Sequence, residues 1–177
     1  MKEIDFRRRA VYIIVALFAF LALAQNPVKL ELVFFKIITH TTQDGKTVEE
    51  LKPVAQVAPG DVLEWHLRAV NTSDQIIKNV ALVIPIPEQT YYLKGSAKPL
   101  TIENNKKIII INPEFSYDGG QTFSAPPLFK KVEKIVDGKK VIEKVLVSPE
   151  EYTHVRWVVA EMLPKETIEV FLRTAVR

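Results

Sequence analysis

The sequence predicts an all-β protein, a sandwich of eight to ten short strands, and three observations lead to that prediction. Apolar and polar residues alternate with a period of two over several stretches, as they do in half-buried strands. Turn-forming groups rich in Asn, Asp and Gly separate these stretches, and such groups are typical of hairpins. They lie at residues 44–45, 104–105, 118–120 and 137–138. No stretch after residue 25 keeps a 3.6-residue period, so we expect at most one helical turn, after Ser148.

Residues 28–39 are expected to form the first strand. Its apolar side chains occupy even positions up to Leu32 and odd positions from Phe35 onward. One extra residue in a strand reverses the side-chain parity, so a β-bulge near Val33 would explain the change.

The clearest strand is residues 62–70. Its odd-numbered side chains are apolar and share one face, whereas Glu64, His66 and Arg68 share the other. The next strand, residues 80–86, is apolar on both faces. This pattern predicts a strand that is covered on both sides or lies at an interface.

Two further strands are expected near the C-terminus, because residues 154–159 and 168–173 alternate in the same way. We therefore predict one domain, residues 25–177, since a chain of about 150 residues can bury one sizeable core. The expected core residues are Leu63, Trp65, Leu67, Leu82, Ile84, Trp157, Val170 and Leu172.

The N-terminus has the pattern of an export signal. Residues 1–9 are basic, residues 10–24 carry no charge, and this stretch ends in Ala22-Leu23-Ala24, the small-x-small pattern that signal peptidases cleave. Its 15 uncharged residues are few for a membrane-spanning helix, which needs roughly 20. We predict a signal helix over residues 1–24 that is cleaved after Ala24, with an uncleaved membrane anchor as the alternative.

Charge and cysteine usage exclude several classes of protein. The chain has 24 basic and 21 acidic residues, of which 20 and 19 follow residue 24, and so nearly neutral a domain is not expected to bind nucleic acid. Cysteine is absent, which excludes disulfides, thiolate metal sites and a cysteine nucleophile. The chain also contains no GxSxG elbow and no glycine-rich phosphate loop, the usual signatures of hydrolases and nucleotide-dependent enzymes.

The order of short motifs over residues 59–96 resembles a known surface module. These motifs are Pro59-Gly60-Asp61, Asn71-Thr72, Asn79-Val80, Ile84-Pro85, Pro87, Tyr91 and Gly95-Ser96. Their order is similar to that in the bacterial and archaeal cell-surface family called domain of unknown function 11, an Ig-like β-sandwich. Many members of that family occur in tandem arrays, whereas this chain has one copy. The resemblance implies an Ig-like fold and a structural or adhesive role at the cell surface, and it implies no catalytic residue.

Glu64, His66 and Arg68 form a cluster that could suggest catalysis, because a base and a stabilising cation can act from one strand face. A half-buried strand nevertheless needs polar side chains on its solvent face, and we expect these three residues to be solvated. Asp61 has the opposite parity and follows Gly60, so it is expected to serve the turn.

No metal or other cofactor is expected. His40, His66 and His154 are far apart and have no HxxxH or HExxH spacing, whereas zinc needs three or four converging ligands. Residues 118–120 together with Glu114 supply too few oxygens for calcium, which needs six to eight. We expect a turn there.

Two further features each have two interpretations. Asn71-Thr72-Ser73 is an N-glycosylation sequon, but the same residues also suit a loop that closes a strand. The hairpin over residues 130–144 has six lysines against three acidic residues. It suits either an arm that touches an acidic polymer or the charged protection of an exposed edge.

These features predict an exported, non-catalytic structural or interaction module in the periplasm, on the cell surface or outside the cell. Its partners would be other envelope or surface proteins or further copies of itself, and it would contact a membrane only through an uncleaved residue 1–24 segment. One alternative is a self-assembling filament subunit whose strand 28–39 leaves its own sandwich and completes a neighbour's sheet. A lesser alternative is an extracytoplasmic enzyme or binding protein that uses Glu64, His66 and Arg68.

Overall fold

The computed structural model describes residues 27–104, 107–136 and 139–177, so the predicted signal helix and its cleavage site lie outside the described residues. The described part of the chain is all-β, as predicted, but it has twelve strands instead of eight to ten. The strands are β1 (Val28–Thr41), β2 (Thr47–Pro53), β3 (Val62–Asn71), β4 (Ile77–Pro85), β5 (Thr90–Tyr92), β6 (Leu100–Asn104), β7 (Lys107–Ile111), β8 (Glu114–Ser116), β9 (Phe129–Val136), β10 (Lys139–Leu146), β11 (His154–Met162) and β12 (Thr167–Val176). Strands as short as β5 and β8 leave little periodic signal in a sequence.

The one helical turn expected after Ser148 is present as the 3₁₀ helix η1 (Pro149–Glu151). Ser148 and Glu151 form its capping box, in which each side chain accepts a hydrogen bond from the other end of the turn, as this pairing does at helix starts. No helix within the described ranges is long and apolar enough to cross a membrane.

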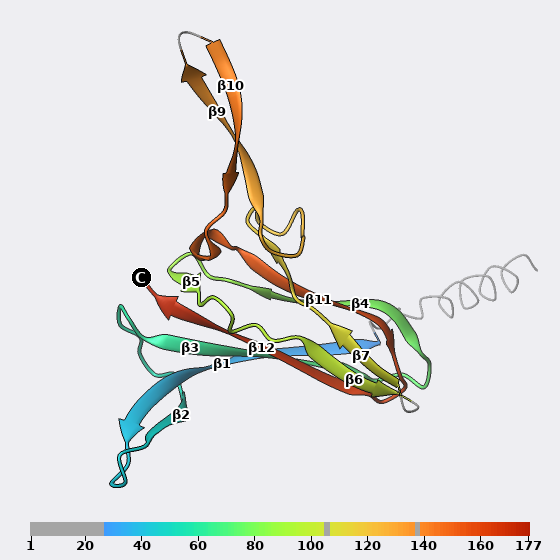
Figure 1. Cartoon of the computed structure of the whole chain (residues 1–177). Coiled ribbons are helices and arrows are strands. Elements are labelled where there is room, and N and C mark those ends of the chain that lie inside the picture. Colours follow the sequence, from blue (N-terminus) through green and yellow to red (C-terminus); the bar gives the residue numbers. More distant parts are fainter. Residues whose placement is uncertain (1–26, 105–106, 137–138) are drawn as a thin grey trace, which may run out of the picture.

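Two antiparallel sheets face each other and form a sandwich-like body (Figure 1). The larger sheet has the order β2-β1-β3-β12-β5, and the smaller has the order β4-β11-β8. Their facing side chains build one core, and seven of the eight expected core residues are buried in the structure. The eighth, Trp65, is half-buried and packs against the core at its rim, with its ring stacked on Phe34 at a centroid distance of 4.7 Å.

β1 is one unbroken strand, so the predicted bulge near Val33 is wrong. Its register with β3 runs without a skip from Val28 to Lys36, and its register with β2 runs without a skip from Phe35 to Thr41. The apolar side chains shift from even to odd positions because Phe34 shares the core-facing side with Trp65, whereas Phe35 shares the opposite face with Glu64. Phe35 lies on the face that turns away from the core, where its ring meets His66 edge-on at 5.5 Å.

β4 is buried on one face only. Val80, Leu82 and Ile84 lie in the core, whereas Ala81 and Pro85 on the other face are exposed. The expectation that this chain covers both faces of β4 is therefore wrong. The alternative, that the exposed face of β4 lies at an interface with another molecule, stays a prediction.

Two hairpins stand outside these sheets. The β6–β7 hairpin packs on the core through Leu100, Ile102 and Ile111. The β9–β10 hairpin instead projects from the body as a free two-stranded arm (Figure 1), and we call residues 129–146 the β9–β10 arm.

Candidate functional site

The expected solvent-exposed trio of Glu64, His66 and Arg68 is split by the structure. Glu64 is only 6% exposed, so its predicted place on the solvated face is wrong. Its Oε1 lies 2.7 Å from Nε2 of His66, which is half-buried. Arg68 is exposed and pairs with Glu169 at 3.3 Å, so it takes no part in the cluster.

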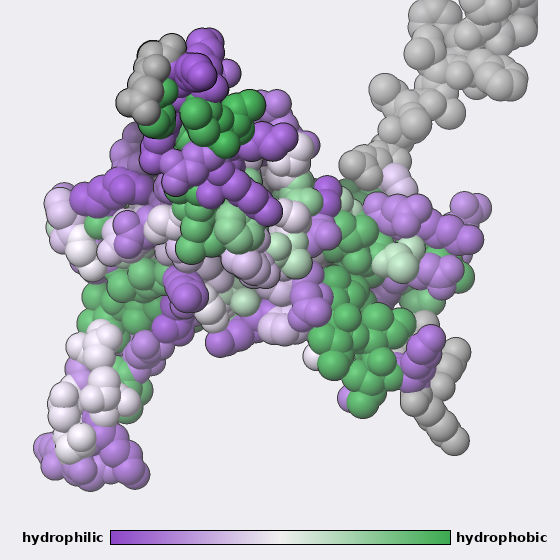
Figure 2. Space-filling view, turned by 45° about the horizontal axis from the view of Figure 1, so that its top comes forward, coloured by the Kyte–Doolittle hydropathy of each residue, from purple (hydrophilic) through white to green (hydrophobic). Residues whose placement is uncertain are grey.

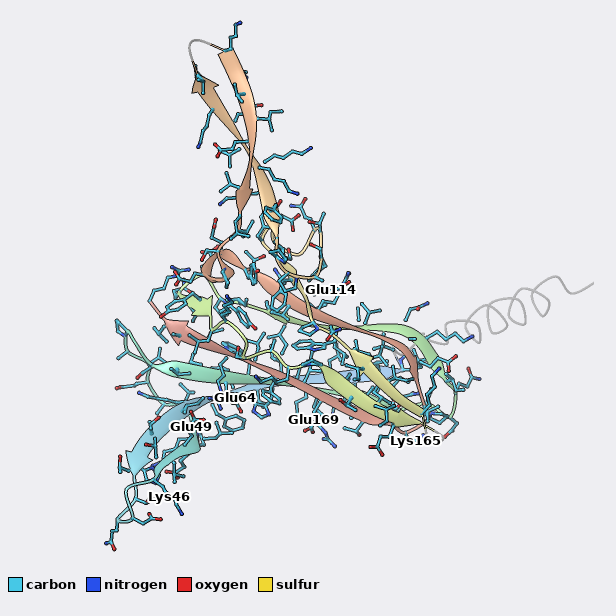
Figure 3. The ribbon with its side chains drawn as sticks, viewed as in Figure 1. Lys46, Glu49, Glu64, Glu114, Lys165 and Glu169 are labelled. Carbon is cyan, nitrogen blue, oxygen red and sulfur yellow. The ribbon has the colours of Figure 1, made fainter. Side chains whose placement is uncertain are left out.

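Arg173 on β12 is the member of this cluster that sequence reasoning missed. Its Nε donates to Oε2 of Glu64 at 2.7 Å, and its terminal nitrogens donate to both oxygens of Glu49 at 3.1 and 2.8 Å. The hydrogen bonds that Arg173 donates to Glu49, and to a lesser extent to Glu64, raise the pKa of its guanidinium. The guanidinium thus joins β12, β3 and β2 where the β1–β2 hairpin leaves the body (Figure 3).

Aromatic rings surround the imidazole of His66. Phe35 meets it edge-on and Phe171 stacks on it at 5.8 Å. Both Glu64 oxygens already accept hydrogen bonds, so neither is directed at open space as a general base would be. These contacts link neighbouring strands, and they pair the buried Glu64 carboxylate with a positive charge, as a buried charge requires.

The Asp118 loop serves a turn, as expected. The Asp118 carboxylate accepts hydrogen bonds from the hydroxyls of Ser116 and Thr122 and from the main-chain nitrogens of Gln121 and Thr122. These bonds hold the pKa of Asp118 well below its usual range, with Thr122 the main cause. The described residues contain no group of three or more His, Asp or Glu side chains that could hold a metal ion.

Asp61 also serves its turn, because it accepts the main-chain hydrogen of Ala58 at 2.7 Å. It additionally accepts from Lys36 of β1 at 2.6 Å, and this hydrogen bond is the main reason that its pKa is lowered.

Asn71 of the sequon is a structural residue. Its side chain is fully buried, and Nδ2 donates to the carbonyls of Gln75, Leu163 and Met162 at 2.7, 2.9 and 3.2 Å. Its Oδ1 accepts from the main chain and the hydroxyl of Ser73. In the folded chain this amide is therefore inaccessible to a glycan, and it fastens the β3–β4 loop to the β11–β12 turn.

An aromatic pocket of about 440 Å³ opens beside η1. The rings of Tyr92, Phe115 and Tyr152 form its wall, with centroids 4.9 to 5.9 Å apart. Pro99, Pro113, Pro126 and Pro149 are among the other lining residues. Burial, with a smaller contribution from Tyr92, raises the pKa of the Tyr152 hydroxyl. The lining suits an apolar group, and the sequence pattern had not indicated it.

The β9–β10 arm carries apolar side chains that the body does not cover. Ile135 is 77% exposed and Ile142 is 65% exposed. The arm is attached at its base through an ion pair between Lys130 and Glu151.

Comparisons with known proteins give no relative for this chain. No family model matches it, and no curated protein and no solved structure is significantly similar to it.

Proposed function

We propose that this chain is an exported, non-catalytic Ig-like module that acts as a structural or interaction element of the cell envelope or surface. The observation that carries the proposal is the β9–β10 arm, a projecting hairpin whose isoleucines remain exposed. An isolated two-stranded hairpin is marginally stable in water, so an arm of this kind gains stability when a partner covers it. The resemblance of residues 59–96 to the domain of unknown function 11 family supports the same role.

The charge and length of the arm fit contact with another protein better than the protection of a sheet edge. The arm pairs with neither of the two large sheets. Its six lysines and three acidic residues are interspersed with apolar side chains, which gives both a hydrophobic contact and solubility when the arm is free.

Shortening the arm tests the proposal. Lys130 and Val145 are cross-strand partners, so residues 131–144 can be replaced by Asn-Gly, a two-residue hairpin turn. We expect this variant to keep the thermal unfolding temperature of the body. In cross-linking of intact cells it should lose the envelope proteins that the parent chain captures. Capture of the same proteins in the same yield would contradict the proposed role of the arm.

A second candidate, a filament subunit that donates strand 28–39, is favoured by one specific observation. Among the described residues, 29–34 of β1 pair with β3 alone, and Leu30, Leu32 and Phe34 are 52%, 39% and 41% exposed on the core-facing side. A strand with an open edge and uncovered apolar side chains is suited to exchange between copies.

A disulfide lock separates this candidate from the first. Glu31 and Arg68 are cross-strand partners and the chain has no cysteine, so Glu31→Cys with Arg68→Cys would fix β1 to its own β3 under oxidising conditions. Donor-strand assembly predicts that the oxidised variant stays monomeric and that a reductant restores polymers. Polymers of equal length in both states would exclude strand donation.

A further inference from the structure

One face of the β9–β10 arm combines its most exposed apolar side chains with lysines. Ile135 pairs with Lys140 and Glu133 pairs with Ile142 across the hairpin, so these side chains project from the same face. The face also includes Phe129, Lys131, Lys144 and Leu146. Three lysines against one glutamate make it basic, and we call these eight residues the arm face.

The body has a groove that is also lined by apolar side chains but carries acidic residues where the arm face carries lysines. It lies between the β6–β7 hairpin and β11 and has a volume of about 280 Å³. Ile102, Ile109, Ile111 and Val159 supply apolar lining, while Glu103 and Glu161 lie on its border. Neither glutamate makes an ion pair with a described residue. Figure 2 shows hydrophobic surface over the β6–β7 hairpin, at the end of the body away from the β9–β10 arm.

The wall of this groove is also an open strand edge. On the side away from β4, β11 pairs with β8 only through residues 154–156. Residues 158–161, which line the groove, have no ladder partner on that side among the described residues. Unpaired main-chain groups of this kind accept an added strand.

The arm and the groove cannot meet within one chain, because they lie at opposite ends of β11. β11 begins at His154, directly after η1 at the base of the arm, and ends at Met162 beside the groove. Charge follows the same division. Of the 20 basic and 19 acidic residues after residue 24, the arm holds six and three. The remainder has 14 basic and 16 acidic residues, so an arm of charge +3 is carried by a body of charge −2.

We propose that the arm face of one copy docks into the β6–β7/β11 groove of a second copy, where it adds a strand to β11 and pairs Lys131 and Lys140 with Glu103 and Glu161. This inference rests on the proposed role of the arm as a contact element and names its partner. A contact between two different surfaces of the same chain is heterologous, so each bound copy leaves one arm and one groove free. The assembly therefore grows head to tail.

Charge reversal on each side tests the contact. The arm variant carries Lys131→Glu and Lys140→Glu, and the groove variant carries Glu103→Lys and Glu161→Lys. The four side chains are exposed, so the fold should be kept, which circular dichroism and thermal unfolding verify. A matched control, Glu50→Lys with Glu88→Lys, makes the same change in net charge as the groove variant at exposed positions outside the groove.

Sedimentation velocity of the chain purified from the exported fraction gives the result. The parent and the control should show a sedimentation coefficient that rises with concentration, and each variant alone should associate at least ten-fold more weakly. An equimolar mixture of the two variants should regain association, because each arm then meets a groove of opposite charge. The inference would be overturned by a parent that stays monomeric or by variants that associate as strongly as the parent. It would also be overturned by a mixture that associates no more strongly than either variant alone.

The proposed function fails by a different result. If the shortened arm leaves envelope capture unchanged, the arm is not the contact element at all. If shortening abolishes capture while the charge exchange has no effect on self-association, the arm contacts another protein and only the inference of a second copy is lost.

Discussion

Arg173 donates from Nε to Oε2 of Glu64 at 2.7 Å, from the last strand of the chain to a carboxylate that is almost fully buried on β3. The same guanidinium holds Glu49 of β2 by two further hydrogen bonds. One side chain thus neutralises a buried charge and fastens the β1–β2 hairpin to the body. This arrangement makes the contribution of Arg173 to stability measurable.

Arg173→Ala should destabilise the fold by about 2–3 kcal/mol, because it leaves the Glu64 carboxylate buried with only His66 beside it. Arg68→Ala is the matched control, since it breaks only the exposed pair with Glu169 and should cost less than about 1 kcal/mol. Urea unfolding followed by circular dichroism compares the two. Equal losses of unfolding free energy in the two variants would show that the buried Glu64–Arg173 pair stabilises the fold no more than the exposed pair does.

Asn71→Asp should cost about 3–5 kcal/mol, because a carboxylate oxygen would replace the Nδ2 that donates to three carbonyls and none of those bonds could form. Asn112→Asp makes the same chemical change at an exposed position and should alter stability by less than about 0.5 kcal/mol. Denaturant midpoints of the two variants give the comparison. A tolerant Asn71 would mean that the two loops are held by other contacts.

The two tryptophans should differ in their contribution to stability. Trp157 is completely buried and donates to the carbonyl of Lys98 at 3.0 Å, so Trp157→Ala should cost about 3–5 kcal/mol. Trp65 lies at the rim with Phe34 on its face, and Trp65→Ala should cost about 1–2 kcal/mol less. Circular dichroism is the suitable probe, because both variants change the fluorescence. A larger loss at Trp65 would contradict the placement of the core.

Stability should fall in acid through the Asp118 turn. The pKa of Asp118 lies below its ordinary value of 3.8 in the folded chain, so its contribution is complete above that value and is lost as the pH falls further. Glu151 has its pKa lowered in the same direction, mainly by Lys130. The melting temperature of the parent should be flat above about pH 5 and decline below it.

Asp118→Asn identifies this contribution. The variant keeps Oδ1 as an acceptor but loses the bond that Oδ2 accepts from the Thr122 hydroxyl. Its melting temperature at pH 7 should lie below that of the parent, and its decline in acid should be shallower. Parallel curves for the two proteins would assign the acid sensitivity to other carboxylates.

Period-two alternation was enough to predict β1, β3, β4, β11 and β12 and most of the core. Leu63, Leu67 and Leu82 are buried as expected, because side-chain parity follows directly from strand geometry. Parity assigns a residue to a face but does not say what covers that face. Glu64 was misplaced for this reason, since its cover comes from Arg173, which lies 109 residues later.

The free projection of the arm and the presence of the groove could not be predicted from sequence patterns, for a related reason. The Asp137-Gly138 pair predicts a hairpin between residues 129 and 144, but a hairpin in a sheet and a free hairpin have the same local sequence signal. The groove is lined by residues of β6, β7 and β11, and Glu103 and Glu161 on its border are 58 positions apart in the chain. Only the folded structure brings them to one surface.

The position of β3 between β1 and β12 has a mechanical consequence. Both neighbours are antiparallel to β3, so β1 and β12 run in the same direction. Val28 at the start of β1 lies opposite Asn71 at the end of β3, and Ala175 near the end of β12 lies opposite Val62 at its start, so Pro27 and Arg177 flank opposite ends of the central sheet. Tension applied between these two residues would load both ladders in shear, so that many hydrogen bonds resist at once and none is opened singly. A chain held at one end and pulled at the other would transmit force through its central sheet without unfolding strand by strand.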